Sequence, residues 1–272
     1  MAEGQELDAL KAAHRTIWAA GDLASVSDLF LPISERLVDE AEVGSGLQVL
    51  EVGTGTGTVA VLAAQRGAKV VGLDLAAELF ESARRRAGAA GVEVAWVEGD
   101  VEDLRFEDGR FERVLSGFGV QFAPRHEVAA HEMVRVCKPA GLIGLVNWTP
   151  EGVFGQTMKT TGRHLPPPPQ FASPPPLWGS ESHVEELFAG TGVELDLRRE
   201  TFTFGIESVE GWIRFLETTY GPTMAAKQRL EPEGTWQDLR RELVALWESF
   251  NEASDGMRVS AEYLLVLGRK RG

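Results

Sequence analysis

The residues best suited to hold a charged ligand lie in the stretch Glu51-Val52-Gly53-Thr54-Gly55-Thr56-Gly57. A short apolar run precedes this stretch and an alanine-rich segment follows it, so we expect it to connect a strand to a helix. Its glycines tolerate positive φ and let a ligand touch the backbone, and the first N–H groups of the helix remain free to donate hydrogen bonds. A glycine-rich turn in this context predicts a nucleotide-like ligand.

The composition of the turn narrows the chemistry of that ligand. A dinucleotide-binding turn carries a third glycine where this chain has Thr58, and the turn lacks the Gly-Lys-Ser/Thr ending of a P-loop. Glu51, two residues before the first glycine, disfavours a diphosphate and favours a ligand with an ammonium group. S-adenosylmethionine carries an ammonium and a sulfonium and no phosphate. The predicted cofactor contacts in the turn are Glu51, Gly53, Thr54 and Gly55.

Two further acids follow apolar runs later in the chain. Asp74 ends the run Val70-Val71-Gly72-Leu73, where an acid accepts hydrogen bonds from both ribose hydroxyls. The alternative for Asp74 is an N-cap of the next helix. Asp100, in Gly99-Asp100-Val101, is placed to bind an adenine amino group while Val101 packs on the ring; otherwise this is an ordinary turn.

The elements that position these residues alternate between apolar runs and helical patterns. This alternation implies right-handed βαβ crossovers and a doubly wound α/β fold, with a mostly parallel sheet covered on both faces. The expected strands are residues 47–52, 69–73, 93–97, 111–115 and 141–148, followed by two period-two strands near 193–204 and 259–267.

The flanks of this core predict added segments within one domain of residues 1–272. The helical patterns at both ends are expected to form a lid over the substrate, or else to pack elsewhere, for example as a dimer interface. The expected segments are an N-terminal helical lid (1–44), a cofactor-binding core (45–150), a Pro-rich connecting loop (151–181) and a helical insertion before the last strand (208–252).

Three stretches together resemble the class I S-adenosylmethionine-dependent methyltransferases, nearest the C-methyltransferases of ubiquinone and menaquinone biosynthesis. They are residues 49–57, 98–104 and 132–141. The resemblance implies a Rossmann-like seven-stranded sheet whose last strand is antiparallel. Ala140 stands where the family usually has a glycine, and the flanking regions match no subfamily that would identify the substrate. The residues for which the resemblance implies cofactor contact are Glu51, Gly53, Gly55, Asp74, Leu75, Asp100 and Val101, with Ser116 and Gly117 beside the methionine part.

The reaction that this implies is in-line displacement of the methyl group from sulfur by an O, N or C atom of a small, apolar or aromatic molecule. A general base is needed only where the acceptor carries a proton, and the candidates are His126 and His14. Several aromatic residues are predicted to line the substrate pocket, and the alternative for each is that it packs in the hydrophobic core. These residues are Trp18, Phe118, Trp148, Trp212, Phe215 and Tyr220.

The amino-acid composition argues against several classes of partner and binding site. The 272-residue chain has 41 acidic and 27 basic residues, a formal charge of −14, which disfavours nucleic acid. Cys137 is the only cysteine and the histidines are scattered, so no disulfide within the chain and no metal site are expected. No signal pattern and no apolar run of about 20 residues are present, so we expect a cytoplasmic protein without membrane segments.

Three other functions remain open on the sequence. One is a non-catalytic protein that binds S-adenosylmethionine, and another is an NAD(P)-dependent reductase, which Thr58 disfavours. The third is a methyltransferase of protein or RNA, which the charge disfavours. The expected partner is a small-molecule substrate, and the expected assembly is a monomer or homodimer.

Overall fold

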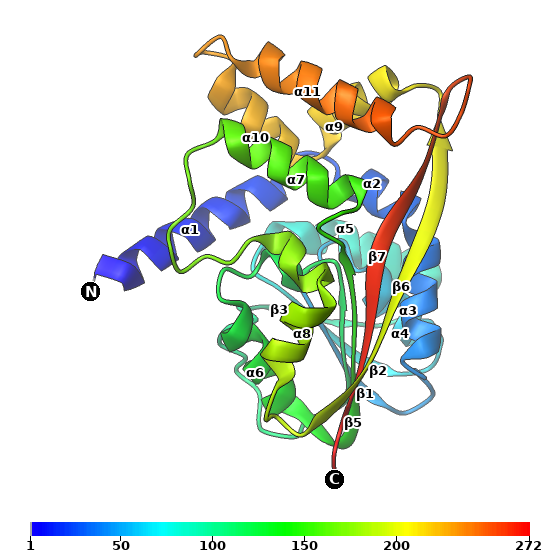
Figure 1. Cartoon of the computed structure of the whole chain (residues 1–272). Helices are drawn as coiled ribbons and strands as arrows, with labels where there is room; N and C mark the ends of the chain where they lie inside the picture. The colour runs from blue at the N-terminus through cyan, green and yellow to red at the C-terminus, as the bar shows by residue number, and fades with distance from the viewer. Residues whose placement is uncertain (1) are drawn as a thin grey trace.

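The computed structural model describes residues 2–272, which form a seven-stranded sheet in the order β3-β2-β1-β4-β5-β7-β6 (Figure 1). Strands β1 to β5 pair in parallel, whereas β7 is antiparallel to both of its neighbours, β5 and β6. The predicted doubly wound sheet with an antiparallel last strand is therefore confirmed. The strands are β1 (Gln48–Val52), β2 (Lys69–Asp74), β3 (Ala95–Glu98), β4 (Phe111–Gly117), β5 (Cys137–Trp148), β6 (Val193–Ile206) and β7 (Met257–Lys270).

Helices cover both faces of the sheet because successive strand residues point to opposite sides. In β1, Val49 joins the apolar core under α3 and α4, and the next residue, Leu50, joins the core under α6 and α8; both are fully buried. Figure 1 shows these two layers on either side of the sheet. The helices are α3 (Leu31–Glu40), α4 (Thr58–Gln65) and α5 (Phe80–Ala90) on one side, and α6 (His126–Val136) and α8 (Glu181–Phe188) on the other.

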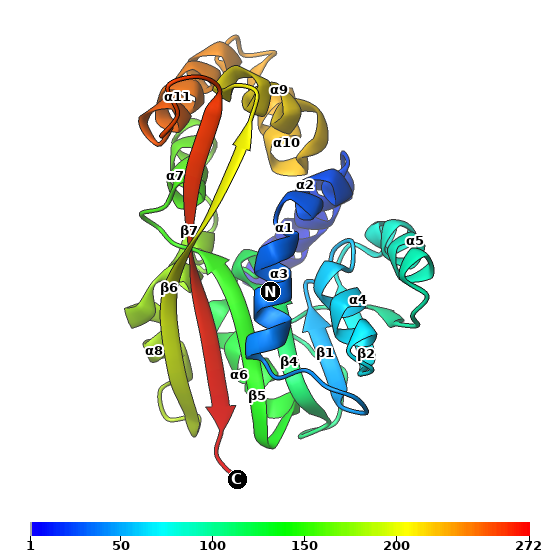
Figure 2. The ribbon, with the colours of Figure 1, turned by 90° about the vertical axis from the view of Figure 1, so that its right-hand side faces the viewer.

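A helical cap lies beyond the carboxyl ends of the parallel strands (Figures 1 and 2). Strands β6 and β7 stay paired past the last residue of β5 and continue as a two-stranded ribbon to this cap. The ribbon therefore ties the cap to the sheet. The cap consists of α1 (Ala2–Ala19), α2 (Leu23–Leu29), α7 (Val153–His164), α9 (Val209–Thr219), α10 (Gly221–Leu230) and α11 (Trp236–Ser249).

The structure adds detail to two of the predicted flanking segments. The N-terminal leader is three helices, because Gly21 at φ +79° separates α1 from α2 and Pro32 lies in the first turn of α3. Residues 151–181 are not a connecting loop throughout, since they contain α7 and a 3-10 helix, Pro175–Gly179. Phe154 and Met158 are four residues apart in α7, and both line the cavity described below. Their spacing is typical of a helix, whereas the prolines that follow α7 had indicated a loop.

Candidate active site

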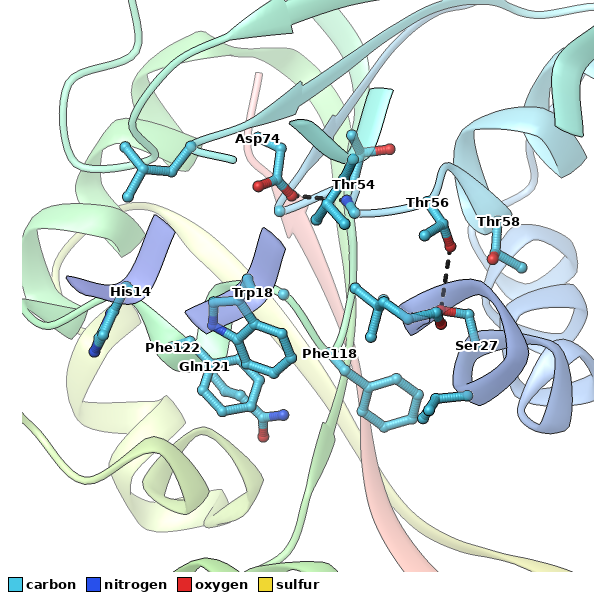
Figure 3. A pocket seen from close by; sticks show the side chains of 18 of the residues that line it. His14, Trp18, Ser27, Thr54, Thr56, Thr58, Asp74, Phe118, Gln121 and Phe122 are labelled. Atoms are coloured by element: carbon cyan, nitrogen blue, oxygen red, sulfur yellow. Dashed lines mark hydrogen bonds between the residues drawn. The ribbon is translucent and has the colours of Figure 1, made fainter. Parts of the chain in front are cut away.

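A cavity of about 240 Å³ opens where the carboxyl ends of β1, β2 and β4 face the helical cap. Figure 3 shows Asp74 and Thr54 on one side of this cavity, and Trp18, Phe118 and Gln121 on the other. The two sides therefore differ in chemistry, one polar and one aromatic. Every predicted cofactor residue except Ser116 lines the cavity, namely Glu51, Gly53, Thr54, Gly55, Asp74, Leu75, Asp100, Val101 and Gly117.

The glycine-rich turn adopts a backbone that other residues resist. Gly53, Gly55 and Gly57 have φ of +62°, +53° and +79°. A Cβ on Gly53 would lie 2.7 Å from Cα of Gly119, so the turn packs directly on the loop after β4. A Cβ on Gly55 would meet only a methyl group of Leu23, at 3.5 Å, and Gly55 lies on the cavity wall. The turn thus offers its backbone to a ligand.

Glu51 is a buried carboxyl group at the end of β1. Its Oε2 accepts hydrogen bonds from the Thr54 hydroxyl and from the Ala60 backbone N–H, the latter at 2.8 Å. Burial raises the pKa of Glu51 to about 8, against the opposing effect of these hydrogen bonds. A cation beside Glu51 would stabilise its ionised form, so this end of the cavity favours a positively charged ligand.

Asp74, the last residue of β2, accepts hydrogen bonds from two backbone N–H groups and is not the N-cap of the next helix, whose N-cap is Ala76. Its Oδ1 accepts from the Ala76 N–H at 2.8 Å, and its Oδ2 accepts from the Gly55 N–H at 2.7 Å. The side chain therefore stabilises the turn after β2 while it lines the cavity. Burial raises the pKa of Asp74. Each carboxylate oxygen keeps a second lone pair, which leaves acceptor capacity for a pair of hydroxyl groups.

Asp100 lies at the same end and is held by a residue that the sequence did not single out. Its Oδ1 accepts from the Glu102 N–H at 2.9 Å, and its Oδ2 accepts from Nζ of Lys11, on α1, at 2.5 Å. Lys11 also reaches Glu102 at 2.6 Å. Among the described residues, Lys11 is the only lysine or arginine on the cavity wall, and these two acids pair its charge.

Ser116 is buried behind the wall rather than on it. Its hydroxyl donates to the Val52 carbonyl at 2.8 Å and accepts from the Val120 N–H at 2.9 Å. These two bonds join the end of β1 to the segment after β4, so Ser116 positions its neighbours. Gly117 does line the cavity, and a Cβ there would lie 2.9 Å from a methyl group of Val59.

The aromatic side of the cavity contains most of the predicted substrate residues. Phe118 stacks on Trp148, with ring centroids 4.1 Å apart and planes 18° apart. Phe118 has φ +64°, a strained backbone for a bulky residue, and such strain is typical of functional sites. Phe215 is not on the wall but stacks on Trp212. The predicted residues that line the cavity are Trp18, Phe118, Trp148, Trp212 and Tyr220.

The two candidate bases occupy different places. His14, on α1, lines the cavity, and burial lowers its pKa although the charge of Glu102 opposes this effect. His126 does not line the cavity. Its Nδ1 lies 3.0 Å from Nε2 of His183, and burial, with His183 next in importance, lowers the pKa of His126 to about 4. The structure therefore leaves His14 as the candidate that an acceptor can reach.

Comparison with known proteins bears directly on this cavity. A model of the methyltransferase domain family matches residues 49–141, which carry the glycine turn, Asp74 and Asp100. An uncharacterized protein of Mycobacterium tuberculosis is 34% identical over 276 residues, covering 98% of this chain and 97% of that protein. A demethylmenaquinone methyltransferase of Thermus thermophilus is 38% identical over 124 residues, covering 44% of this chain and 56% of that enzyme. The chain belongs to the class I S-adenosylmethionine-dependent methyltransferases.

Solved structures agree with this assignment at the level of the fold. The YcgJ protein of Bacillus subtilis superposes with a TM-score of 0.64 at 20% identity, covering 88% of this chain and 98% of that one. The sequence resemblance to the quinone-biosynthesis type is confirmed over 44% of the chain. Within residues 2–272, no helix combines the length and apolar character needed to cross a bilayer.

Several residues that line the cavity of this methyltransferase were not predicted from the sequence. Thr58 is mostly buried and its Oγ1 has no hydrogen-bond partner in residues 2–272. Gln121 is fully buried and both of its amide atoms also lack partners there. The places of Thr58 and Gln121 in the sequence could have indicated that they line the cavity. Thr58 immediately follows the glycine turn, and Gln121 lies shortly after β4, at the carboxyl ends of the strands, where α/β sheets bind ligands. For Lys11 no local signal existed, because its partner Asp100 is 89 residues away.

Proposed function

We propose that this methyltransferase transfers a methyl group from S-adenosylmethionine to an O, N or C atom of a small, apolar or aromatic molecule. The observation that carries the proposal is a single cavity with carboxylates and exposed glycine backbone at one end and an aromatic wall at the other. This pairing suits a cationic cofactor beside a flat or apolar acceptor.

The charge balance of the polar end fits S-adenosylmethionine. Glu51, Asp74 and Asp100 are acidic, and the one cation on the described wall, Lys11, is already paired. A ligand with a sulfonium and an ammonium is favoured there, whereas the phosphates of a nicotinamide cofactor would be repelled. We assign Asp74 to the ribose hydroxyls, Asp100 and Val101 to the adenine, and Glu51 with the glycine turn to the methionine end.

The aromatic end would hold the acceptor and keep water away. When bound, the sulfonium supplies an activated methyl group, so the protein has mainly to align the acceptor with it. Alignment of this kind is worth up to roughly 7–11 kcal/mol in ideal systems. The rings of Phe118, Trp148 and Phe154 stack in a column, each phenyl centroid 4.1 Å from that of Trp148, which makes this part of the wall rigid enough for such alignment. Aromatic faces also attract a sulfonium by about 0.5–2 kcal/mol.

We further propose that the N-terminal helices and the helices between β6 and β7 act together as a lid. Trp18 of α1 packs against Tyr220, with ring centroids 5.6 Å apart, and the Asp22 N–H donates to the Thr219 carbonyl at 2.9 Å. Trp18 and Tyr220 both line the cavity. Since the two segments contact each other over the site, movement of one would require movement of the other.

His14 is the proposed general base for a protonated acceptor. Its lowered pKa keeps the imidazole neutral near pH 7, so it can accept a proton from a phenol or an enol. His14→Gln would then reduce kcat for such acceptors by about 10²–10⁴-fold and remove the acidic limb of the pH–rate profile. A merely structural role would lower stability and leave the shape of that profile unchanged.

A methyl-transfer screen tests the proposed function. The protein is incubated with methyl-labelled S-adenosylmethionine and a panel of phenols, aromatic amines and quinols, with bulk tRNA and a protein mixture as comparison acceptors. Labelled product from a member of the small-molecule panel is expected. Labelling of the tRNA or protein alone would contradict the substrate class, and binding without any transfer would favour a non-catalytic role.

A further inference from the structure

Gln121 stands out among the side chains of the cavity. It belongs to a 3-10 helix, Val120–Phe122, directly after β4, and it lines the cavity although the residue is 0% exposed. Neither Oε1 nor Nε2 has a hydrogen-bond partner among residues 2–272. Figure 3 shows Gln121 beside Trp18 and Phe122, on the side of the cavity away from Asp74.

A buried amide without partners is unfavourable, because it has given up its hydrogen bonds to water and gained none in return. Such groups in native proteins call for an explanation, and a bound ligand supplies one for a side chain that lines a cavity. The amide of Gln121 has both a donor and an acceptor to satisfy. The ligand group that meets it must therefore supply both.

The backbone that carries Gln121 is held in place by its neighbours. Its 3-10 helix is fixed by the hydrogen bond from the Val120 N–H to Ser116 and by the bond from the Phe122 N–H to the Gly119 carbonyl at 3.2 Å. The ring of Phe122 packs on Trp18, with centroids 4.5 Å apart. Neither ring offers a hydrogen-bond acceptor to the Gln121 amide.

We propose that Gln121 binds a hydroxyl group of the methyl acceptor, which makes the acceptor a hydroxylated aromatic compound. The inference rests on the proposed function. A hydroxyl donates to Oε1 and accepts from Nε2, whereas a carbonyl or ether accepts only and leaves Oε1 without a partner. A buried site built to bind a hydroxyl discriminates strongly against an analogue that lacks it, so Gln121 is a specificity-determining residue.

The test compares two probes of similar shape on the protein saturated with S-adenosylhomocysteine. Calorimetry measures the binding of 1-naphthol and of 1-methylnaphthalene, in which a methyl group replaces the hydroxyl. The wild-type protein is expected to bind 1-naphthol about tenfold or more tightly than 1-methylnaphthalene, the effect of one to two hydrogen bonds. In Gln121→Leu this preference should fall to about twofold or less.

A second substitution of Gln121 and a control variant complete the experiment. Gln121→Met keeps the length of the side chain and should lose the preference as Gln121→Leu does, so either variant suffices if the other fails to fold. Gln65→Leu, at the exposed end of α4, is the matched control and should keep the wild-type preference.

The outcomes separate this inference from the proposed function. Equal affinity of the wild-type protein for the two probes would overturn it, as would a preference that persists in both Gln121 variants. Failure to bind either probe while S-adenosylhomocysteine binds would also overturn the hydroxylated aromatic class. If the wild-type protein does not bind S-adenosylhomocysteine, that result would instead contradict the proposed function itself.

Discussion

Lys11 of α1 donates a hydrogen bond from Nζ to Oδ2 of Asp100, at 2.5 Å, and so ties the N-terminal helix to the loop after β3. The same ammonium reaches Glu102 at 2.6 Å, and the Glu102 side chain is 0% exposed. Arg125 completes the pairing of Glu102 at 2.7 Å. A charge network therefore holds α1 over the end of the cavity assigned to the adenine.

Removal of the Lys11 ammonium should loosen α1 without unfolding the core. In Lys11→Met, amide hydrogen exchange in residues 2–19 should accelerate by about tenfold or more, because a partly buried, charge-assisted hydrogen bond is lost. Lys159→Met, at an exposed position of α7, is the control. Unchanged exchange in residues 2–19 would show that other contacts hold α1 in place.

The lid proposal makes a separate prediction for the wild-type protein. Addition of S-adenosylhomocysteine should increase protection against hydrogen exchange in both residues 2–40 and 208–252, because the two segments contact each other through Trp18 and Tyr220. Protection that rises only around residues 50–60, 74 and 100 would argue against a lid. The helices would then be better explained as an assembly surface.

Cofactor binding should release a proton from Glu51. Burial raises its pKa to about 8 in the ligand-free protein, so the carboxyl is mostly protonated at pH 7. A bound cation favours the carboxylate and lowers that pKa, so binding should release up to about one proton and strengthen as pH rises from 6 to 8. Calorimetry of S-adenosylmethionine in buffers of different ionisation enthalpy measures this release.

Glu51→Gln supplies the comparison for that measurement, because the amino group of the cofactor titrates equally with both proteins. The released fraction should be larger for the wild-type protein than for Glu51→Gln at pH 7. Identical proton release by the two proteins would contradict this prediction, because it would mean that the ionisation of Glu51 does not change when the cofactor binds.

Ala140, which stands at a usual glycine position of the family, should limit stability. It has φ +61°, a left-handed backbone that costs an alanine roughly 1–2 kcal/mol and a glycine little. Ala140→Gly should therefore stabilise the protein by about 0.5–1 kcal/mol, after the added freedom of the unfolded chain is subtracted. Thermal unfolding should show Tm raised by about 1–3 °C. Ala89→Gly, in the exposed part of α5, should instead lower Tm.

Much of the fold follows from local patterns in the sequence. The alternation of apolar runs and helices predicted the parallel sheet, and the glycine turn between β1 and α4 predicted where a ligand would enter. Asp74 and Asp100 could be placed at the cavity because Asp74 ends one parallel strand and Asp100 follows the next, and the carboxyl ends of such strands share one edge of the sheet.

The finer assignment of side chains depended on contacts that no local pattern records. Ser116 and Gly117 are adjacent, yet only Gly117 faces the cavity, since the Ser116 hydroxyl bonds backbone groups behind it. His126 lies close to β4 in sequence but pairs with His183, 57 residues away. Lys11 reaches Asp100 across 89 residues. Distances of this kind are set by packing and not by sequence spacing.

The most direct test of the account is the affinity of the cavity for S-adenosylhomocysteine in the wild-type protein and in Asp74→Ala. Calorimetry should show binding of this ligand and of S-adenosylmethionine to the wild-type protein, and no binding of NAD. Asp74→Ala should weaken binding about 10- to 150-fold, because a charged acceptor of hydrogen bonds is lost. Asp255→Ala, at an exposed position, should bind as the wild-type protein does. Equal affinity in Asp74→Ala, or binding of NAD by the wild-type protein, would contradict the assignment of this cavity to S-adenosylmethionine.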